Sequence, residues 1–214
     1  MIYVPIIHTE ADMGSMSDSL RDKYIQKYGE DKWLNHINEI DSMWNSIEKK
    51  LDELNFSYKN VKIYQDGLPN CGAGMSAPAW TADRCGNAQV EKKIVIDIAK
   101  KGSKNHQLLI KLLDKGAQLI GTENPKLLIE EYKTILGTLK QTKETNKDFI
   151  DNYKKKAEKQ LFERDKYISR RIDETLKDNE TGILFIGMMH KVNEFLPKDI
   201  KIDFLTHNMQ YEKV

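Results

Sequence analysis

The sequence predicts a single α/β domain, built on a mostly parallel central sheet that helices flank, with one long charged helix. Short apolar runs alternate along the chain with longer segments of helical period, an order typical of parallel strands joined by right-handed crossovers. The run GILFIGMM, residues 182–189, is the most apolar in the chain and too short for a helix, so it predicts a central strand. A chain of 214 residues can form one core, so we treat residues 1–214 as one domain.

Five strands are expected, from short runs rich in β-branched, aromatic or aliphatic residues. The first, IYVPII, contains Pro5, which has no N–H to donate and favours an edge or an irregular pairing. The last, IKIDFL, alternates in the manner of an edge strand. The expected strands are 2–7, 61–64, 117–122, 182–189 and 200–205.

Six helices are expected from apolar residues that recur every three or four positions. Gly29, Gly116 and Gly137 mark helix ends, and Pro125 begins a helix, where its missing N–H is not needed. The last helix is long and highly charged, with one apolar stripe that would lie along the domain. The expected ranges are 17–28, 30–55, 88–101, 105–114, 125–136 and 140–177.

Residues 67–86 predict a long loop that covers a binding site as a lid. The segment is rich in glycine and proline and shows neither a strand nor a helix period. Loops of this length in compact domains are usually functional, and Trp80 is the expected anchor. Cys71 and Cys85 lack the Cys-x-x-Cys spacing of a zinc or thioredoxin motif, which favours free thiols over a disulfide that would close the loop.

Composition argues against two classes of partner. The 34 basic residues balance 33 acidic ones, so the whole molecule has no strong field for nucleic acid or an anionic membrane. A mean hydropathy of -0.64 leaves no room for a membrane span, and the apolar start is too short for a signal peptide. We therefore expect a cytoplasmic protein whose ligand is a small molecule or a peptide.

Each of the first four expected strands is followed within three residues by an ionisable side chain: His8, Asp66, Glu123 and His190. In an open parallel sheet, ligands bind beyond the carboxyl ends of the strands, so residues distant in sequence converge there. The sequence therefore predicts a site formed by these four residues. For His8, a partly buried histidine bonded to backbone is the alternative.

The apolar stripe of the long helix contains an acid. Leu161, Ile168 and Ile172 are spaced so that Asp165 falls among them, with Arg164 on the flank. A buried carboxylate needs a partner, because burying it unpaired is costly. Asp165 therefore either pairs with an arginine and ties the helix to the sheet, or opens into a polar cavity as a site residue.

Two neighbouring segments resemble the closing signature of a known superfamily. Glu163-Arg164-Asp165 lies on the helix before the apolar strand, and that strand, Gly182-Ile-Leu-Phe-Ile-Gly-Met-Met-His190, ends in Gly-x-x-His. This combination resembles the TraB/TIKI-like superfamily, which also includes the erythromycin esterases and the haem-binding ChaN-like proteins. Glu123 and His8 fall where members carry a Glu and a His. The chain departs from the pattern at its front, where the usual Gly-x-x-His motif is absent.

Two further departures are Asp165 in place of Asn and Gln65-Asp66 in place of a strand-end Glu. The resemblance implies a hydrolase, with His8 and His190 as bases or metal ligands, Glu123 and Asp66 as acidic partners and Arg164 at an oxyanion or substrate charge. TIKI-like members imply a metal, and esterase-like members a histidine without one, so both routes stay open. The expected catalytic residues are His8, Glu123, Arg164 and His190, the expected ligand contacts are Asp66, Trp80 and Asp165, and the expected ligands of a divalent metal are His8, Glu10, Glu123 and His190.

Two other functions fit the same sequence. A binding protein without chemistry would hold a small molecule or haem under the loop, as the ChaN-like resemblance implies. A helical interaction module would dock a partner on residues 140–177. His36 and His106 are expected on helix surfaces without ligand-spaced companions, and the Gly-rich phosphate-binding and nucleophile-elbow motifs do not occur.

Overall fold

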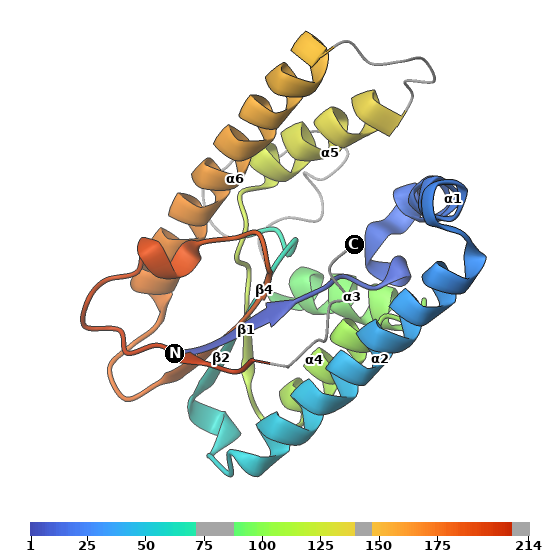
Figure 1. Ribbon diagram of the computed structural model, residues 1–214. Helices are drawn as coiled ribbons and strands as arrows, with labels where there is room; N and C mark the ends of the chain where they lie inside the picture. The colour runs from blue at the N-terminus through green and yellow to red at the C-terminus, as the bar shows by residue number, and fades with distance from the viewer. Residues whose placement is uncertain (72–87, 140–146, 207–214) are drawn as a thin grey trace.

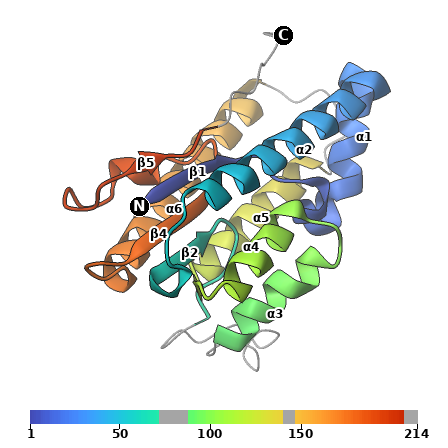
Figure 2. The same ribbon diagram turned by 90° about the horizontal axis from the view of Figure 1, so that it is seen from below.

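The computed structural model describes residues 1–71, 88–139 and 147–206, and its centre is a five-stranded sheet in which every pairing is parallel. The strand order is β3-β2-β4-β1-β5, which confirms the predicted α/β class (Figures 1 and 2). The strands are β1 Ile2–Ile6, β2 Val61–Gln65, β3 Gln118–Ile120, β4 Thr181–Gly187 and β5 Asp203–Phe204.

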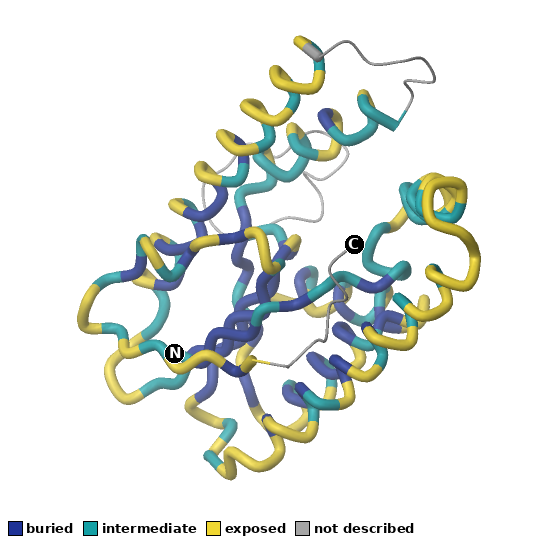
Figure 3. Tube along the Cα trace, in the orientation of Figure 1, coloured by how far each residue is buried: buried dark blue, intermediate teal, exposed yellow. Residues whose placement is uncertain are grey.

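Helices cover both faces of this sheet. The described helices are α1 Ser17–Tyr28, α2 Glu30–Glu53, α3 Ala88–Ala99, α4 Lys104–Asp114, α5 Pro125–Leu139 and α6 Lys147–Thr175, with short 3-10 turns η1 Glu10–Met16, η2 Tyr58–Asn60 and η3 Val192–Glu194. Trp44 of α2 and Leu109 of α4 belong to the core on one face, together with Phe185 of β4. Ile168 and Ile172 of α6 form the core on the other face. The strands between these two cores are the most continuously buried part of the chain (Figure 3).

The long charged helix extends past the sheet. Helix α6 packs against α5, and the two helices together project beyond the body of the domain (Figure 1). Only the second half of α6 lies on the sheet, which is why its fully buried apolar residues are Ile168 and Ile172. No described helix is both long enough and apolar enough to cross a membrane.

Pro5 is accommodated because the edge strand beside it is short. Strand β5 pairs only with Ile2 and Tyr3, and the backbone oxygen of Tyr3 accepts from Leu205 on that side. Backbone groups of a strand alternate in direction, so the nitrogen of Pro5 points to the same side as Tyr3, past the end of β5. The position where a donor is missing is therefore one where β5 offers no acceptor.

Strand β4 ends earlier than its apolar sequence predicts. The expected strand 182–189 stops at Gly187, because the register pairs Gly187 with Ile6, the last residue of β1. Met188 and Met189 lie in the following turn with 50% and 77% of their surface exposed. The turn closes when the His190 N–H donates to the backbone oxygen of Gly187, which directs the chain back over the sheet edge.

Other element ends shift by a few residues. The expected end of a helix at Gly137 is wrong, because α5 continues to Leu139. The edge strand expected over 200–205 is reduced to Asp203–Phe204. The loop expected over 67–86 is described only to residue 71, so most of it, including Trp80 and Cys85, lies outside the described residues.

Candidate functional site

The four ionisable residues that follow the first four strands lie at one edge of the sheet. His8 Nε2 is 3.0 Å from Asp66 Oδ2, and His190 Nε2 is 3.7 Å from the same oxygen. Arg164 joins Glu123 to this group, because its Nη2 contacts both Glu123 Oε1 and Asp66 Oδ1. The segments involved follow β1, β2, β3 and β4, so the parallel topology is what brings them together.

Arg164 is the centre of the acidic side of the cluster. Its Nε and Nη2 donate to Glu123, its Nη2 also donates to Asp66, and its Nη1 donates to both oxygens of Glu131 on α5, at 2.5 to 3.2 Å. These five contacts equal the number of N–H groups that a guanidinium carries. The expected role of Arg164 at an oxyanion does not agree with this geometry, because every N–H is directed at a carboxylate among the described residues.

Asp165 is turned inward, as its place in the apolar stripe predicts, but its partner is not an arginine. Its Oδ1 lies 2.5 Å from His190 Nδ1, and its Oδ2 accepts the backbone N–H of Lys191 at 2.8 Å. The carboxylate therefore fixes the orientation of the His190 ring and leaves Nε2 directed toward Asp66. Asp66 holds His8 in the same manner. Two of the three residues expected to contact a ligand, Asp66 and Asp165, are thus the partners of the two histidines.

Gly187 has no side chain, and this leaves space for Asp66, His8 and His190. Its backbone N–H donates to Asp66 Oδ2 at 2.9 Å. A Cβ added at this position would lie 3.0 Å from that oxygen and 3.5 Å from both His8 Nε2 and His190 Cδ2. Any side chain at this position would crowd Asp66 and the two histidines. This steric limit explains why the Gly-x-x-His segment has glycine at position 187.

Burial and charge set the ionisation of the cluster. Burial raises the pKa of Glu123, and the nearby Arg164 opposes that rise only in part. Burial acts on Asp66 in the same direction, but the hydrogen bond and charge of His8, with Arg164, bring its pKa well below the usual range. For His8, burial lowers the pKa, yet the hydrogen bond to Asp66 and the charges of Asp66 and Asp12 outweigh it and the pKa is raised.

One group in this cluster has the composition of a metal site. Single ligand atoms of Asp66, Glu123 and His190 all lie within 4.8 Å of one another, and all three residues are buried. Of the expected metal ligands His8, Glu10, Glu123 and His190, this group contains Glu123 and His190, and its third member is Asp66. Glu10 does not join it, because its Oε1 accepts from Ser17 and Arg21 on α1.

The first residues of the expected lid pack beside Glu123. The backbone N–H of Asn70 donates to the backbone oxygen of Glu123. The backbone oxygen of Leu68 accepts the backbone N–H groups of Thr122 and Glu123. Gly67 N–H faces the Glu123 carboxylate at 3.4 Å. Residues 67–71 are thus part of the surroundings of the site. The rest of the expected lid lies outside the described residues.

Two parts of the site are not evident in the sequence. Glu131 meets Arg164 because α5 and α6 pack together, and periodicity alone does not say which helices are neighbours. The expectation that His106 lies on a helix surface is wrong, since it is 6% exposed and contacts Asp12 and Ser103. The available signal was Ser103 just before α4, a typical N-cap residue whose side chain accepts the His106 N–H.

The fold and the cluster define an α/β protein with a buried histidine–carboxylate group at the carboxyl edge of a parallel sheet. No protein-family model, curated protein or solved structure matches this chain in the comparisons.

Asp165 provides a first test of this geometry. Replacing Asp165 with Asn leaves one oxygen for two donors, so we expect a loss of unfolding free energy of about 1–3 kcal/mol, the cost of leaving a buried donor without a partner. Urea denaturation followed by circular dichroism measures it. Glu163→Gln, an exposed neighbour on the same helix, is the matched control. Equal midpoints for the two variants would contradict the described role of Asp165.

Proposed function

We propose that this chain is a hydrolase in which His8 is the general base that activates water. The observation that supports this most is the 3.0 Å contact between His8 Nε2 and Asp66 Oδ2, at the sheet edge where parallel α/β proteins bind ligands. The side chain of His8 is 29% exposed, whereas those of Asp66 and His190 are 5% and 4% exposed. Of His8, Asp66 and His190, His8 is thus the one that a substrate and water can reach.

The proposed reaction uses the two ring nitrogens of His8 differently. Asp66 accepts the Nε2–H, which leaves the lone pair on Nδ1. Nδ1 takes a proton from water while the water oxygen forms a bond to the electrophilic carbon or phosphorus of the substrate. The bond to the leaving group then breaks, and the proton passes from Nδ1 to that group, so the ring returns to its neutral form.

The rest of the cluster prepares this base. The hydrogen bond and charge of His8, together with the positive charge of Arg164, keep Asp66 ionised in spite of its burial, and an ionised Asp66 stabilises the imidazolium that forms during proton transfer. Gly187 N–H fixes the same carboxylate from the side of β4. His190 is buried, and its Nε2 lies 3.7 Å from Asp66 Oδ2 while Asp165 holds its Nδ1. His190 is therefore the second acid–base candidate.

A divalent metal is the second route to an activated water, favoured by the grouping of Asp66, Glu123 and His190. A bound ion would lower the pKa of a coordinated water. The donor types suit such an ion, but Arg164 contacts oxygens of both carboxylates, so an ion needs Arg164 to move away. The proposed reaction therefore uses His8 as the base.

The experiment is a hydrolysis panel on the purified chain. Ester, peptide and phosphodiester substrates are tested after dialysis against a chelator, with and without added Zn²⁺, Mn²⁺ or Mg²⁺, and the metal content is measured. We expect hydrolysis of one class that survives the chelator. Activity that returns only with an added ion would replace the His8 route with the metal route. No hydrolysis of any class would reject the enzyme and favour the binding protein without chemistry.

A further inference from the structure

A second buried polar cluster lies behind His8, and the proposed reaction does not use it. Asp12 of η1 meets Ser103 and His106 at the start of α4. Asp12 Oδ1 is 2.5 Å from Ser103 Oγ and 3.1 Å from His106 Nδ1, and Ser103 Oγ is 2.8 Å from the same ring nitrogen. The side chains of Asp12 and His106 are 4% and 7% exposed, so this cluster has no direct access to a substrate.

The other oxygen of Asp12 holds the residue that follows His8. Asp12 Oδ2 accepts the backbone N–H of Thr9 at 2.7 Å and the Thr9 hydroxyl at 2.8 Å, and the Asp12 N–H donates back to the Thr9 oxygen. The contacts therefore form a continuous path from α4 through Asp12 and Thr9 to His8. Burial opposes ionisation of Asp12, but the hydrogen bonds from His106 and Ser103 outweigh it and its pKa is lowered.

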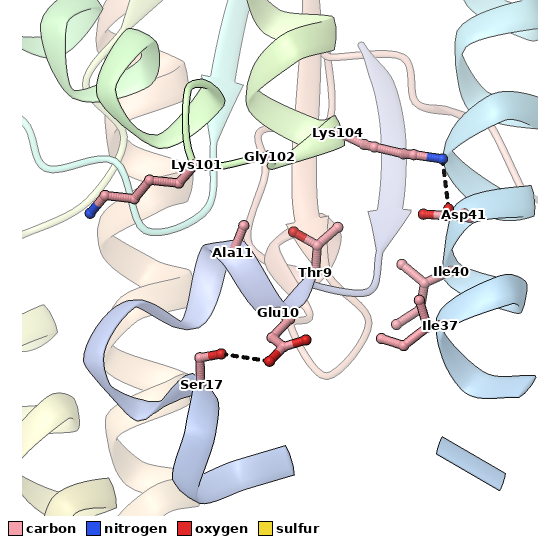
Figure 4. A pocket seen from close by; sticks show the side chains of 10 residues that line it. All are labelled: Thr9, Glu10, Ala11, Ser17, Ile37, Ile40, Asp41, Lys101, Gly102 and Lys104. Atoms are coloured by element: carbon pink, nitrogen blue, oxygen red, sulfur yellow. Dashed lines mark hydrogen bonds and ion pairs between the residues drawn. The ribbon is translucent and has the colours of Figure 1, made fainter. Parts of the chain in front are cut away.

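Apart from Ile7, which packs against the core, and the contact of His8 with Asp66, the described segment that carries His8 is held by these hydrogen bonds. Strand β1 ends at Ile6, so His8 and Thr9 lie beyond the sheet pairing. On the side of α2, a pocket of about 480 Å³ separates Thr9, Glu10 and Ala11 from Ile37 and Ile40 (Figure 4). Figure 4 also shows Thr9 facing Gly102 and Lys104, the residues on either side of Ser103 in the sequence. Because this pocket lies between Thr9 and α2, the position of Thr9 depends on its hydrogen bonds to Asp12 more than on apolar packing against α2.

We propose that Asp12, clamped by Ser103 and His106, is a positioning residue that sets the place of His8 against Asp66. The inference rests on the proposed function, since it gives the cluster a role in hydrolysis. A base must be held close to its productive geometry, and a misplacement of about 1 Å can cost on the order of 100-fold in rate. A buried acid at this position is otherwise expensive compared with an aliphatic residue.

The test compares two replacements of His106. His106→Leu removes the donor to Asp12, whereas His106→Asn keeps an N–H donor near the position of Nδ1. The first readout is the rate at which diethyl pyrocarbonate modifies His8, measured by mass spectrometry on the tryptic peptide 1–21, which contains no other histidine. The modification of His36 in the same digest serves as the internal reference. The second readout is kcat and KM on the substrate found in the panel.

We expect His106→Leu to raise the modification rate of His8 several-fold, because the ring leaves Asp66 and exposes both nitrogens. It should lower kcat by roughly 10- to 100-fold with little change in KM, and His106→Asn should restore most of both values. A loss of thermal stability with unchanged His8 modification and unchanged kcat would show a structural tie only and overturn the proposal.

If His106→Leu does not fold, a second variant, Asp12→Asn, tests the same proposal. Asp12→Asn is isosteric, yet its amide cannot accept from both Thr9 and the Ser103–His106 pair, so it opens one side of the clamp. A wild-type rate of His8 modification in Asp12→Asn would overturn the positioning role. The modification assay needs no substrate. If the panel shows no hydrolysis while the modification rate rises as expected, the proposed function fails and the clamp on His8 stands.

Discussion

Replacing Arg164 with methionine should lower the free energy of unfolding by on the order of 3–5 kcal/mol, the size expected when one partner of a buried ionic network is removed. Asp66 and Glu123 are 7% and 0% exposed, and Arg164 contacts both. Methionine fills a similar volume, so the loss reports the missing charge more than a cavity. Urea denaturation at neutral pH, followed by circular dichroism, measures the effect.

The loss should shrink as the pH falls. Without Arg164 the pKa values of the two buried carboxyls rise, because its positive charge no longer opposes the effect of burial, although His8 still opposes that effect at Asp66. Protonation then removes the unpaired charge. The unfolded chain takes up those protons only near the ordinary pKa values, so Arg164→Met gains stability relative to wild type on acidification toward pH 5. A difference that stays constant with pH would contradict the ionic explanation.

Arg170→Met is the control. Arg170 lies on the same helix, its side chain is 64% exposed, and it pairs with Glu174 at 3.6 Å on the surface. An exposed pair of this kind contributes about 0–1 kcal/mol. A loss for Arg164→Met as small as that of Arg170→Met would mean that the carboxylates of the cluster do not depend on the guanidinium.

The positions of His8, Asp66, Glu123 and His190 were predictable because they follow from topology. Parallel strands carry their carboxyl ends to one edge, so it is enough to identify each strand and the ionisable residue after it. The inward turn of Asp165 was predictable for a similar reason, since helical period fixes the face on which a residue lies.

The partners of these residues were not predictable in the same way. A stripe tells which face of a helix is buried, but it does not tell which other element covers that face. Arg164 has Glu131 as a partner because α5 packs on α6. The apolar run 182–189 continues two residues past the end of β4, because that end is set by the length of β1 and not by the sequence of β4 itself.

His106 shows the same limit. Helix α4 is covered by α3, by α2 and by the sheet, so its buried face is wider than one apolar stripe and includes Asn105 and His106. The helical period of the sequence predicts that His106, a polar residue beside the leucine stripe, lies on the surface. Only the packing of the neighbouring helices shows that His106 is buried. Asp12 lies in the short 3-10 turn η1, which has neither a strand period nor an α-helical period, so the sequence gives no periodic signal for its burial.

Replacing His8 with glutamine should lower kcat for the hydrolysed substrate by about 10²- to 10⁴-fold, the usual contribution of a general base. The amide nitrogen of glutamine can still donate to Asp66, so the carboxylate keeps a partner, but the side chain has no nitrogen that takes up a proton. The midpoint of urea denaturation should therefore change little. His36→Gln is the matched control, because His36 stacks on Tyr24 of α1, outside the cluster.

The pH profile separates a base from a residue that only binds substrate. The reaction requires neutral His8, so kcat/KM should fall as the pH drops through the pKa of His8, which lies above the ordinary value of 6.5 because Asp66 and Asp12 stabilise the charged ring against its burial. His8→Gln should lose this acidic limb together with the rate. A variant that keeps the wild-type limb, or a kcat within a few-fold of wild type, would exclude His8 as the base and move the search to His190, whose ring Asp165 already holds toward Asp66.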